Sequence, residues 1–222
     1  MSVGSKGKNK KLKTKQRIIN QAIALFNKDG VRNVTIRNIA SEMAIAHGNL
    51  TYHYKNKEDL LLAIYGQMRI EMSQSYILSK DSATSFEHFH RLLLHLEHFQ
   101  LKYRFFNLDV LEISRTFSKI NEVLQDTLLL RRDQMVKLFQ GFLDEDLIDG
   151  TSVDDYTRLR HTIRILITFW LSQMEVFPES GTKEEGEMVA HIWNLIEPHM
   201  TENGKKEFTR VSEQFLRYEE EV

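Results

Sequence analysis

The sequence of 222 residues has no cysteine, two prolines and ten glycines. The lack of cysteine excludes disulfides, thiolate metal ligands and cysteine nucleophiles. The scarcity of proline and glycine favours long helices over many turns. No apolar run approaches the roughly 18 residues that a membrane-spanning helix needs, and the basic start has no apolar stretch behind it of the kind found in secretory signals. We therefore expect a cytoplasmic protein with no membrane association.

Charge is distributed unevenly along a chain whose formal net charge is only −1. Residues 1–57 carry nine lysines and three arginines but only two acids, Asp29 and Glu42, which gives +10, whereas the remainder carries −11. A basic segment joined to an acidic body is typical of a polyanion-binding unit attached to a second domain. With 41% hydrophobic residues, the chain can also bury a substantial core.

Apolar residues recur at helical spacing along nearly the whole chain, and no alternating strand pattern of useful length is present. The sequence therefore predicts an all-α protein. Gly30 is expected to end the first helix, and Thr35 and Asn56 are expected to cap the second and the fourth. Beyond the fourth helix, the pattern predicts helices over residues 86–106, 108–117, 123–143, 152–177, 182–196 and 205–217.

The short helices in the basic first quarter of the chain have the plan of a helix-turn-helix DNA-binding unit. If the third helix starts near Ala46, then Ala46, Leu50 and Tyr54 share its inner face. Its other faces carry hydrogen-bonding and aromatic side chains without an acid. Such a surface suits a phosphate-lined groove when cations flank it, because each cation neutralises a phosphate and releases counterions. The predicted parts are a basic flexible arm (1–13), a helix-turn-helix domain (14–57), a linking fourth helix (about 57–75) and a larger helical domain (76–222).

The stretch TIRNIASEMAIAHGNLTYHYKNKEDLL (35–61), preceded by RIINQAIALFNKDGVRNV, resembles the DNA-binding domain of the TetR-type (TetR/AcrR) transcriptional regulators. This resemblance implies an all-helical second domain for ligand binding and dimerisation. It also implies a homodimeric repressor, without a cofactor, that a small-molecule effector releases from a near-palindromic operator in double-stranded DNA. The matching features are Ala22-x-x-Leu25-Phe26 before Gly30, Thr35-Ile36-Arg37-x-Ile39-Ala40, Gly48, Leu50, and Asn56-Lys57-Glu58-x-Leu60-Leu61.

The same resemblance implies DNA-binding roles for individual residues. Contacts to bases or to the adjacent backbone are implied for Arg37, His47, Gly48, Asn49 and Tyr52. Contacts to phosphates are implied for Thr51, His53 and Lys57, with Thr35 at the start of the second helix.

Three positions depart from the family pattern. Thr51 is shorter than the tyrosine usual there, and Ala46 stands where a capping Ser or Thr is common. Tyr54 replaces an apolar residue, so its hydroxyl needs a hydrogen-bond partner or a route to solvent.

Aromatic residues in the middle helices are candidates both for the core and for an effector pocket. The resemblance implies that these helices enclose such a pocket. The residues assigned to it are Phe99, Tyr103, Phe106, Phe117 and Phe139.

The histidines of the predicted helix 86–106 allow a metal or ligand site as an alternative. Arg91 and Lys102 lie on the same stripe, however, and cations repel a metal ion. A solvated or pH-sensitive polar stripe is therefore the preferred interpretation, and no metal ligand is predicted. The histidines concerned are His88, His90, His95 and His98.

The predicted helix 152–177 is apolar nearly all round, which indicates burial on two sides. The resemblance implies that this helix and the helix over 182–196 form a four-helix interface with a second subunit. The residues assigned to this interface are Ile163, Ile167, Trp170, Met174, Ile192 and Ile196.

Two other functions remain open from the sequence alone. One is a helical enzyme, or a ligand- or metal-binding protein, that uses the histidine-bearing helix. The other is a protein-interaction module whose helix-turn-helix no longer reads DNA. No nucleophile–base pair or glycine-rich phosphate loop supports an enzyme, so no catalytic residue is predicted. The segment 205–222 has no predicted role.

Overall fold

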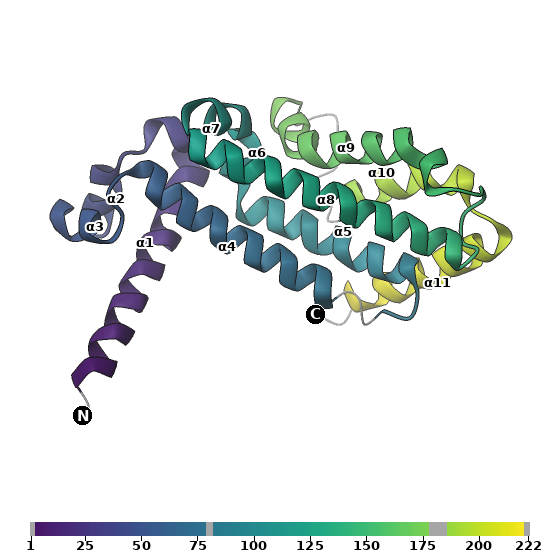
Figure 1. Cartoon of the computed structure of the whole chain (residues 1–222), viewed down its shortest axis with the longest axis horizontal. Coiled ribbons are helices and arrows are strands. Elements are labelled where there is room, and N and C mark those ends of the chain that lie inside the picture. Colours follow the sequence, from purple (N-terminus) through teal and green to yellow (C-terminus); the bar gives the residue numbers. More distant parts are fainter. Residues whose placement is uncertain (1–2, 79–81, 178–185, 220–222) are drawn as a thin grey trace. The chain divides into compact units, whose positions relative to one another are not determined.

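The computed structural model describes residues 3–78, 82–177 and 186–219, and helices account for most of them (Figure 1). Apart from one antiparallel bridge between Ile148 and Met200, these ranges contain no β-structure, which confirms the all-α prediction. The elements are α1 (Val3–Asn33), α2 (Ile36–Glu42), α3 (His47–His53), α4 (Lys57–Leu78), α5 (Ser85–Lys102), α6 (Arg104–Leu108), α7 (Val110–Thr116), α8 (Ser118–Asp144), η2 (Val153–Tyr156), α9 (Thr157–Val176), α10 (Glu187–Ile196), η3 (Glu197–His199) and α11 (Glu202–Glu219).

The chain divides into two compact units that are not continuous in sequence. Unit 1 comprises Met1–Ile70 and Tyr103–Asp126, and unit 2 comprises Glu71–Lys102 and Thr127–Val222. The sequence placed everything after residue 75 in one second domain. The structure instead groups α6, α7 and the start of α8 with the helix-turn-helix. The ring centroids of Phe26 and Phe105 lie 5.3 Å apart, and both rings are buried. This contact between α1 and α6 is one reason that α6 belongs to unit 1.

The local signals in unit 1 act as the sequence predicts. Gly30 interrupts α1 with a φ of 76° and a ψ of 154°. Thr35 caps α2 in a capping box with Asn38, whose side chain binds the Thr35 backbone in return. The Asn56 side chain accepts the Asp59 N–H at 2.8 Å at the start of α4. Helix α3 begins after Ala46 without a side-chain cap.

Several predicted boundaries are wrong, and α1 starts well before residue 14, at Val3. The single helix expected over 86–106 is broken at Tyr103, which has non-helical dihedral angles (φ −110°, ψ 40°) and precedes α6. Helix α8 begins at Ser118, and the capping box at Ser152 opens the short 3-10 helix η2 ahead of α9. The second predicted capping box, at 182–185, lies outside the described residues.

Aromatic side chains dominate the core of unit 2. Trp193 of α10 meets Phe86 and Phe89 of α5 edge-on at 4.9 and 5.5 Å, and Phe142 of α8 packs against the same two rings. Such tilted and edge-to-face pairs are the favoured aromatic arrangements. The buried carboxylate of Glu97 accepts the N–H groups of Gly186 and Met188, at 2.7 and 3.1 Å, so α5 also caps the start of α10.

Helix α11 contacts the rest of unit 2 by polar bonds and by close backbone approach. Arg210 binds both Glu207 on its own helix and the buried Glu87 of α5, at 2.7 and 3.0 Å. At Gly204, an added Cβ would lie 1.8 Å from the carbonyl oxygen of Leu147. The helix can approach that carbonyl only because residue 204 has no side chain.

Candidate nucleic-acid interface

The recognition surface predicted on α3 is exposed. Helices α2 and α3 lie side by side within unit 1 (Figure 1). Leu50 is fully buried and Tyr54 is 7% exposed, as the sequence predicted for the inner face of α3. Ala46, which was predicted to share that face, is instead exposed, because it precedes the first turn of the helix. The exposed surface of α3 carries the side chains of His47, Asn49 and Tyr52, with the backbone of Gly48 between them. Tyr52 is 71% exposed.

Two of the predicted phosphate contacts already have hydrogen bonds within the chain. The Thr51 hydroxyl donates to the carbonyls of His47 and Gly48, at 3.2 and 3.3 Å. The Thr35 hydroxyl lies 2.5 Å from Asn38 Oδ1 and accepts the Asn38 N–H at 3.2 Å. Both hydroxyl protons are thus directed at protein acceptors in this conformation. His53 is half-buried, and its ring meets that of Tyr52 at 5.3 Å.

Lys57 is also directed inward. Its Nζ atom donates to the carbonyl of Val31 and the side chain is half-buried. Burial lowers the pKa of Lys57, while the nearby carboxylates of Glu112 and Asp109 raise it. The amino group is therefore paired within unit 1. By contrast, Arg37 and Lys55 are exposed.

A further cation lies against α3 from α1. Lys15 Nζ is 5.9 Å from the centroid of the Tyr54 ring, within the range of a cation–π contact. Lys13 and Arg17 on the same helix are exposed. The basic residues of α1 are therefore carried on a helix whose side chains reach the end of α3.

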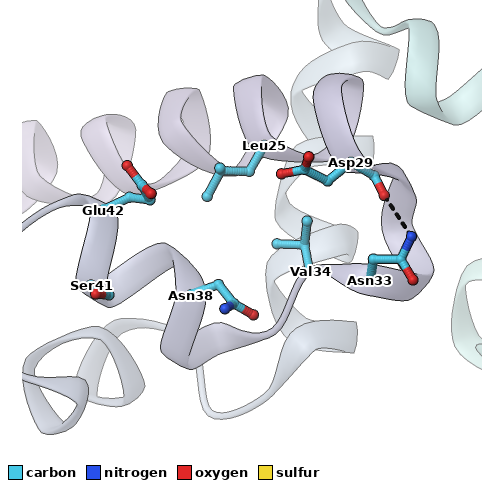
Figure 2. Close-up of a pocket in the computed structure, with 7 residues that line it drawn as sticks. All are labelled: Leu25, Asp29, Asn33, Val34, Asn38, Ser41 and Glu42. Carbon is cyan, nitrogen blue, oxygen red and sulfur yellow. Dashed lines mark hydrogen bonds between the residues drawn. The ribbon is translucent and has the colours of Figure 1, made fainter.

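A hollow of about 510 Å³ lies between α1 and α2 (Figure 2). Two carboxylates, Asp29 and Glu42, line it, and none of its lining residues is basic. Asn33 closes one end by donating to the Asp29 carbonyl at 2.9 Å. An acidic hollow repels phosphate, so we do not assign it to the DNA-binding surface. The lining residues are Leu25, Asp29, Asn33, Val34, Asn38, Ser41 and Glu42.

The five aromatic residues assigned to an effector pocket fall in both units, so neither unit brings them together. Phe99 and Phe139 belong to unit 2, where Phe139 is a core residue that packs on Phe142 at 5.0 Å. In unit 1, Phe106 stacks on Tyr65 at 5.1 Å and Phe117 ends α7. Tyr103 is fully buried, and its hydroxyl accepts a hydrogen bond from Gln67 at 3.1 Å.

The interface residues predicted from the resemblance need correction. Ile163, Ile192 and Ile196 are fully buried in the core of unit 2, so they cannot reach a second subunit. Ile167, Trp170 and Met174 are half-buried. Helical spacing correctly located the apolar residues. It could not show that part of them is buried within the same chain instead of being exposed to a second subunit. The apolar side chains left exposed on α9 are Ile165, Phe169 and Val176, at 49%, 48% and 68%.

The histidines of α5 have different surroundings. His90 accepts a hydrogen bond from Trp193 in the core, and His88 packs on Tyr76 at 5.1 Å. His98 is exposed. Within the described ranges, no three histidines, aspartates or glutamates are placed so that they could hold a metal ion. The same ranges contain no helix long and apolar enough to cross a membrane.

Comparisons with known proteins agree with this architecture. Residues 18–64 match the family model of bacterial regulatory proteins of the tetR family, and residues 67–208 match that of the TetR bacterial transcriptional repressors. The second match alone spans more than half of the chain. The chain therefore belongs to the TetR family of bacterial transcriptional regulators.

Two relatives among the curated proteins match over part of the chain. The Transposon Tn10 TetC protein of Escherichia coli is 36% identical over 72 residues, which are 32% of this chain and 36% of that protein. The uncharacterized HTH-type transcriptional regulator YerO of Bacillus subtilis is 49% identical over 49 residues, 22% of this chain and 17% of YerO. The chain thus spans about a third or less of these relatives' length.

Solved structures share the fold over nearly the whole chain. A TetR-family transcriptional regulator from Marinobacter aquaeolei VT8 has a TM-score of 0.81 at 21% identity and covers 91% of this chain and 98% of its own. A regulator from Saccharomonospora viridis, solved in complex with choline, has a TM-score of 0.70 at 21% identity and covers 86% and 98%.

Proposed function

We propose that this protein is a sequence-specific DNA-binding regulator, acting as a repressor in the cytoplasm. The observation that carries this proposal is the exposed surface of α3, which has hydrogen-bonding and aromatic groups and no acid. Asn49 has the shape for adenine, and His47 and Tyr52 can reach base edges or phosphates. The flanking cations Arg37, Lys55 and those of α1 supply attraction to phosphate that depends on salt.

We further propose that the protein binds DNA as a homodimer formed through α9 and α10. Ile165 and Phe169 are one helical turn apart and each is about half exposed. Next to them, the half-buried Trp170 packs on the exposed His191 of α10 at 5.2 Å. Covering this surface by a twofold-related copy buries it, and the symmetry predicts a near-palindromic operator.

We also propose that a small-molecule effector controls the affinity for the operator. Gln100 supports a site between α5 and α9, because it is 2% exposed and donates to the Ile167 carbonyl at 2.7 Å. Its Oε1 atom has no hydrogen-bond partner in the described part of the chain. A buried acceptor of this kind favours an apolar effector with one hydroxyl or amine donor.

The DNA-binding proposal is tested by selecting duplexes from a random pool with the full-length wild type. Enrichment of a near-palindromic sequence, bound more weakly as salt rises, supports it. Enrichment of no sequence contradicts it and would favour a protein-interaction module. Screening small molecules for a thermal shift then tests the effector, because a ligand of the native state raises its stability.

A further inference from the structure

The backbone of Val31 binds two side chains that come from different parts of unit 1. Its N–H donates to Oδ2 of Asp109 at 2.8 Å, and its carbonyl accepts from Nζ of Lys57. Because Gly30 is non-helical, Val31 starts a new turn whose first N–H lacks a helical acceptor. The side chains supply the missing partners. We call Val31, Lys57 and Asp109 the Val31 junction.

The helices α2 and α3 form a hairpin over residues 34–56, which we call the recognition hairpin. The Val31 junction lies where this hairpin joins the rest of unit 1. Val31 is near the end of α1, which leads into the hairpin, and Lys57 is the first residue of α4, which leads out of it. The hairpin between them, residues 34–56, contains α2 and α3. A bond from residue 57 to residue 31 therefore fixes the incoming and outgoing chain to each other. The start and the end of the hairpin are then held in one orientation relative to each other.

The third member, Asp109, comes from the segment between α6 and α7. Two neighbouring hydrogen bonds also connect this part of the chain to α1 and α4. The Phe105 N–H donates to Asn27 Oδ1 at 2.9 Å, and the Lys119 N–H donates to Glu58 Oε1 at 3.3 Å. The first bond holds α6 on the end of α1, and the second holds the start of α8 on the start of α4. Both ends of the hairpin are thus bonded to the 103–119 segment.

Electrostatics separates this role from a phosphate contact. Asp109 and Glu112 are the acids that act on the Lys57 amino group. A cation paired with carboxylates contributes less to counterion release than one on a phosphate. An acid such as Asp109, if it acted only through its charge, would weaken DNA binding. Its removal should then strengthen binding, unless its hydrogen bond is needed to place α3.

We propose that the Val31 junction sets the orientation of α3 relative to the α6–α8 segment, so that Asp109 and Lys57 are positioning residues for DNA binding that do not touch DNA. The inference rests on the proposed DNA binding and specifies the residues that control it.

The test uses full-length protein and the duplex that the wild type selects from a random pool. If the wild type selects no duplex, the proposed function has failed independently of the junction. The dissociation constant is measured over a range of salt concentrations for Asp109→Ala, Asp109→Asn, Lys57→Gln and the double variant Asp109→Ala/Lys57→Gln. The matched control is Glu122→Gln, which removes an exposed acid from α8 in the same unit.

We expect Asp109→Ala and Lys57→Gln each to weaken binding roughly 10-fold, since each removes a hydrogen bond to the Val31 backbone. Asp109→Asn, which keeps an acceptor, should weaken binding less. The salt dependence should not change, and the double variant should be about as weak as the weaker single variant, because both changes remove one coupled unit. Glu122→Gln should bind as well as the wild type or slightly better.

Two results would overturn the proposal. One is binding by Asp109→Ala that is as tight as that of Glu122→Gln. The other is a slope of log affinity against log salt that falls by about one for each Lys57 replaced, which identifies a lost phosphate contact. Asp109→Ala could lower the melting temperature too far for binding to be measured. In that case the proposal is overturned if Asp109→Asn binds as tightly as Glu122→Gln, or if Lys57→Gln lowers the salt slope as described.

Discussion

Trp193 donates a hydrogen bond from its indole Nε1 to Nδ1 of His90, at 3.0 Å, inside the core of unit 2. His90 is 8% exposed, and burial lowers its pKa to about 4. Nδ1 can accept this bond only when it carries no proton. The neutral imidazole is therefore part of the folded structure, and its protonation would break this hydrogen bond between α5 and α10.

The first prediction is that His90 makes the folded state less stable in mild acid. An unfolded histidine has a pKa near 6.5, so the unfolded state binds more protons between pH 6.5 and pH 4. The contribution is complete above pH 6.5 and is lost as the pH falls toward 4, by at most about 3 kcal/mol. Urea unfolding at pH 7 and pH 5 measures this loss.

The matched variants for the first prediction are His90→Gln and His98→Gln. Glutamine at position 90 keeps an acceptor for Trp193 but does not titrate, so the loss between pH 7 and pH 5 should shrink. Replacing the exposed His98 should leave it as in the wild type. An equal loss in all three proteins would show that His90 is not its source.

The second prediction concerns Gly204. Gly204→Ala should destabilise the fold by about 2–4 kcal/mol, because its Cβ would overlap the Leu147 carbonyl and force α11 away. Gly66→Ala in α4 is the control: its Cβ meets no atom within 4 Å, so stability should rise by up to about 1 kcal/mol. Chemical denaturation measures both, and equal effects would contradict the close approach.

The third prediction concerns the proposed dimer. Phe169→Glu should shift the protein toward the monomer, because a charge would be buried when two copies of α9 meet. Ile77→Glu, at a residue of α4 that is 63% exposed, should leave the dimer intact. Light scattering after gel filtration gives the mass of each. A Phe169→Glu variant that remains dimeric at micromolar concentration would place the interface elsewhere.

The fourth prediction separates base reading from phosphate binding. Asn49→Ala should relax the preference at one base position of each half-site, at a cost of about 1–3 kcal/mol for the preferred base. Lys55→Ala should weaken all sequences alike and lower the salt dependence. Binding to a set of single-base operator variants distinguishes them. If both variants gave the same profile, Asn49 would not read a base.

The sequence was most informative where a structure depends on neighbouring residues. Gly30, Thr35 and Asn56 end or cap helices through dihedral angles and hydrogen bonds within a few positions, so their roles follow from local spacing. The buried Leu50 and the exposed Asn49 likewise follow from helical periodicity. The exposed face of α3 was therefore predictable, whereas the inward hydrogen bonds of Thr51 and Lys57 were not.

Long-range relationships left no such signal. Asp109 bonds to Val31 across 78 positions, and no periodicity in either segment indicates the pairing. The burial of individual residues on α9 left no such signal either. Ile163 and Phe169 both lie on an apolar helix, but only the packing of the unit 2 core decides that Ile163 is covered while Phe169 is exposed. Chain order likewise suggested a simple division into two domains.

The discontinuity of unit 1 has a consequence for synthesis on the ribosome. The chain leaves this unit after Ile70 and returns to it at Tyr103, so a nascent chain that ends near residue 102 still lacks Phe105 and Asp109. Until those residues emerge, Phe26 has no aromatic partner from α6 and the Val31 N–H has no carboxylate. Although domains commonly fold from the N-terminus during translation, here the unit that holds the first helices to emerge is complete only after the middle of the chain has been made. A fragment that ends after the fourth helix would likewise lack Phe105 and Asp109.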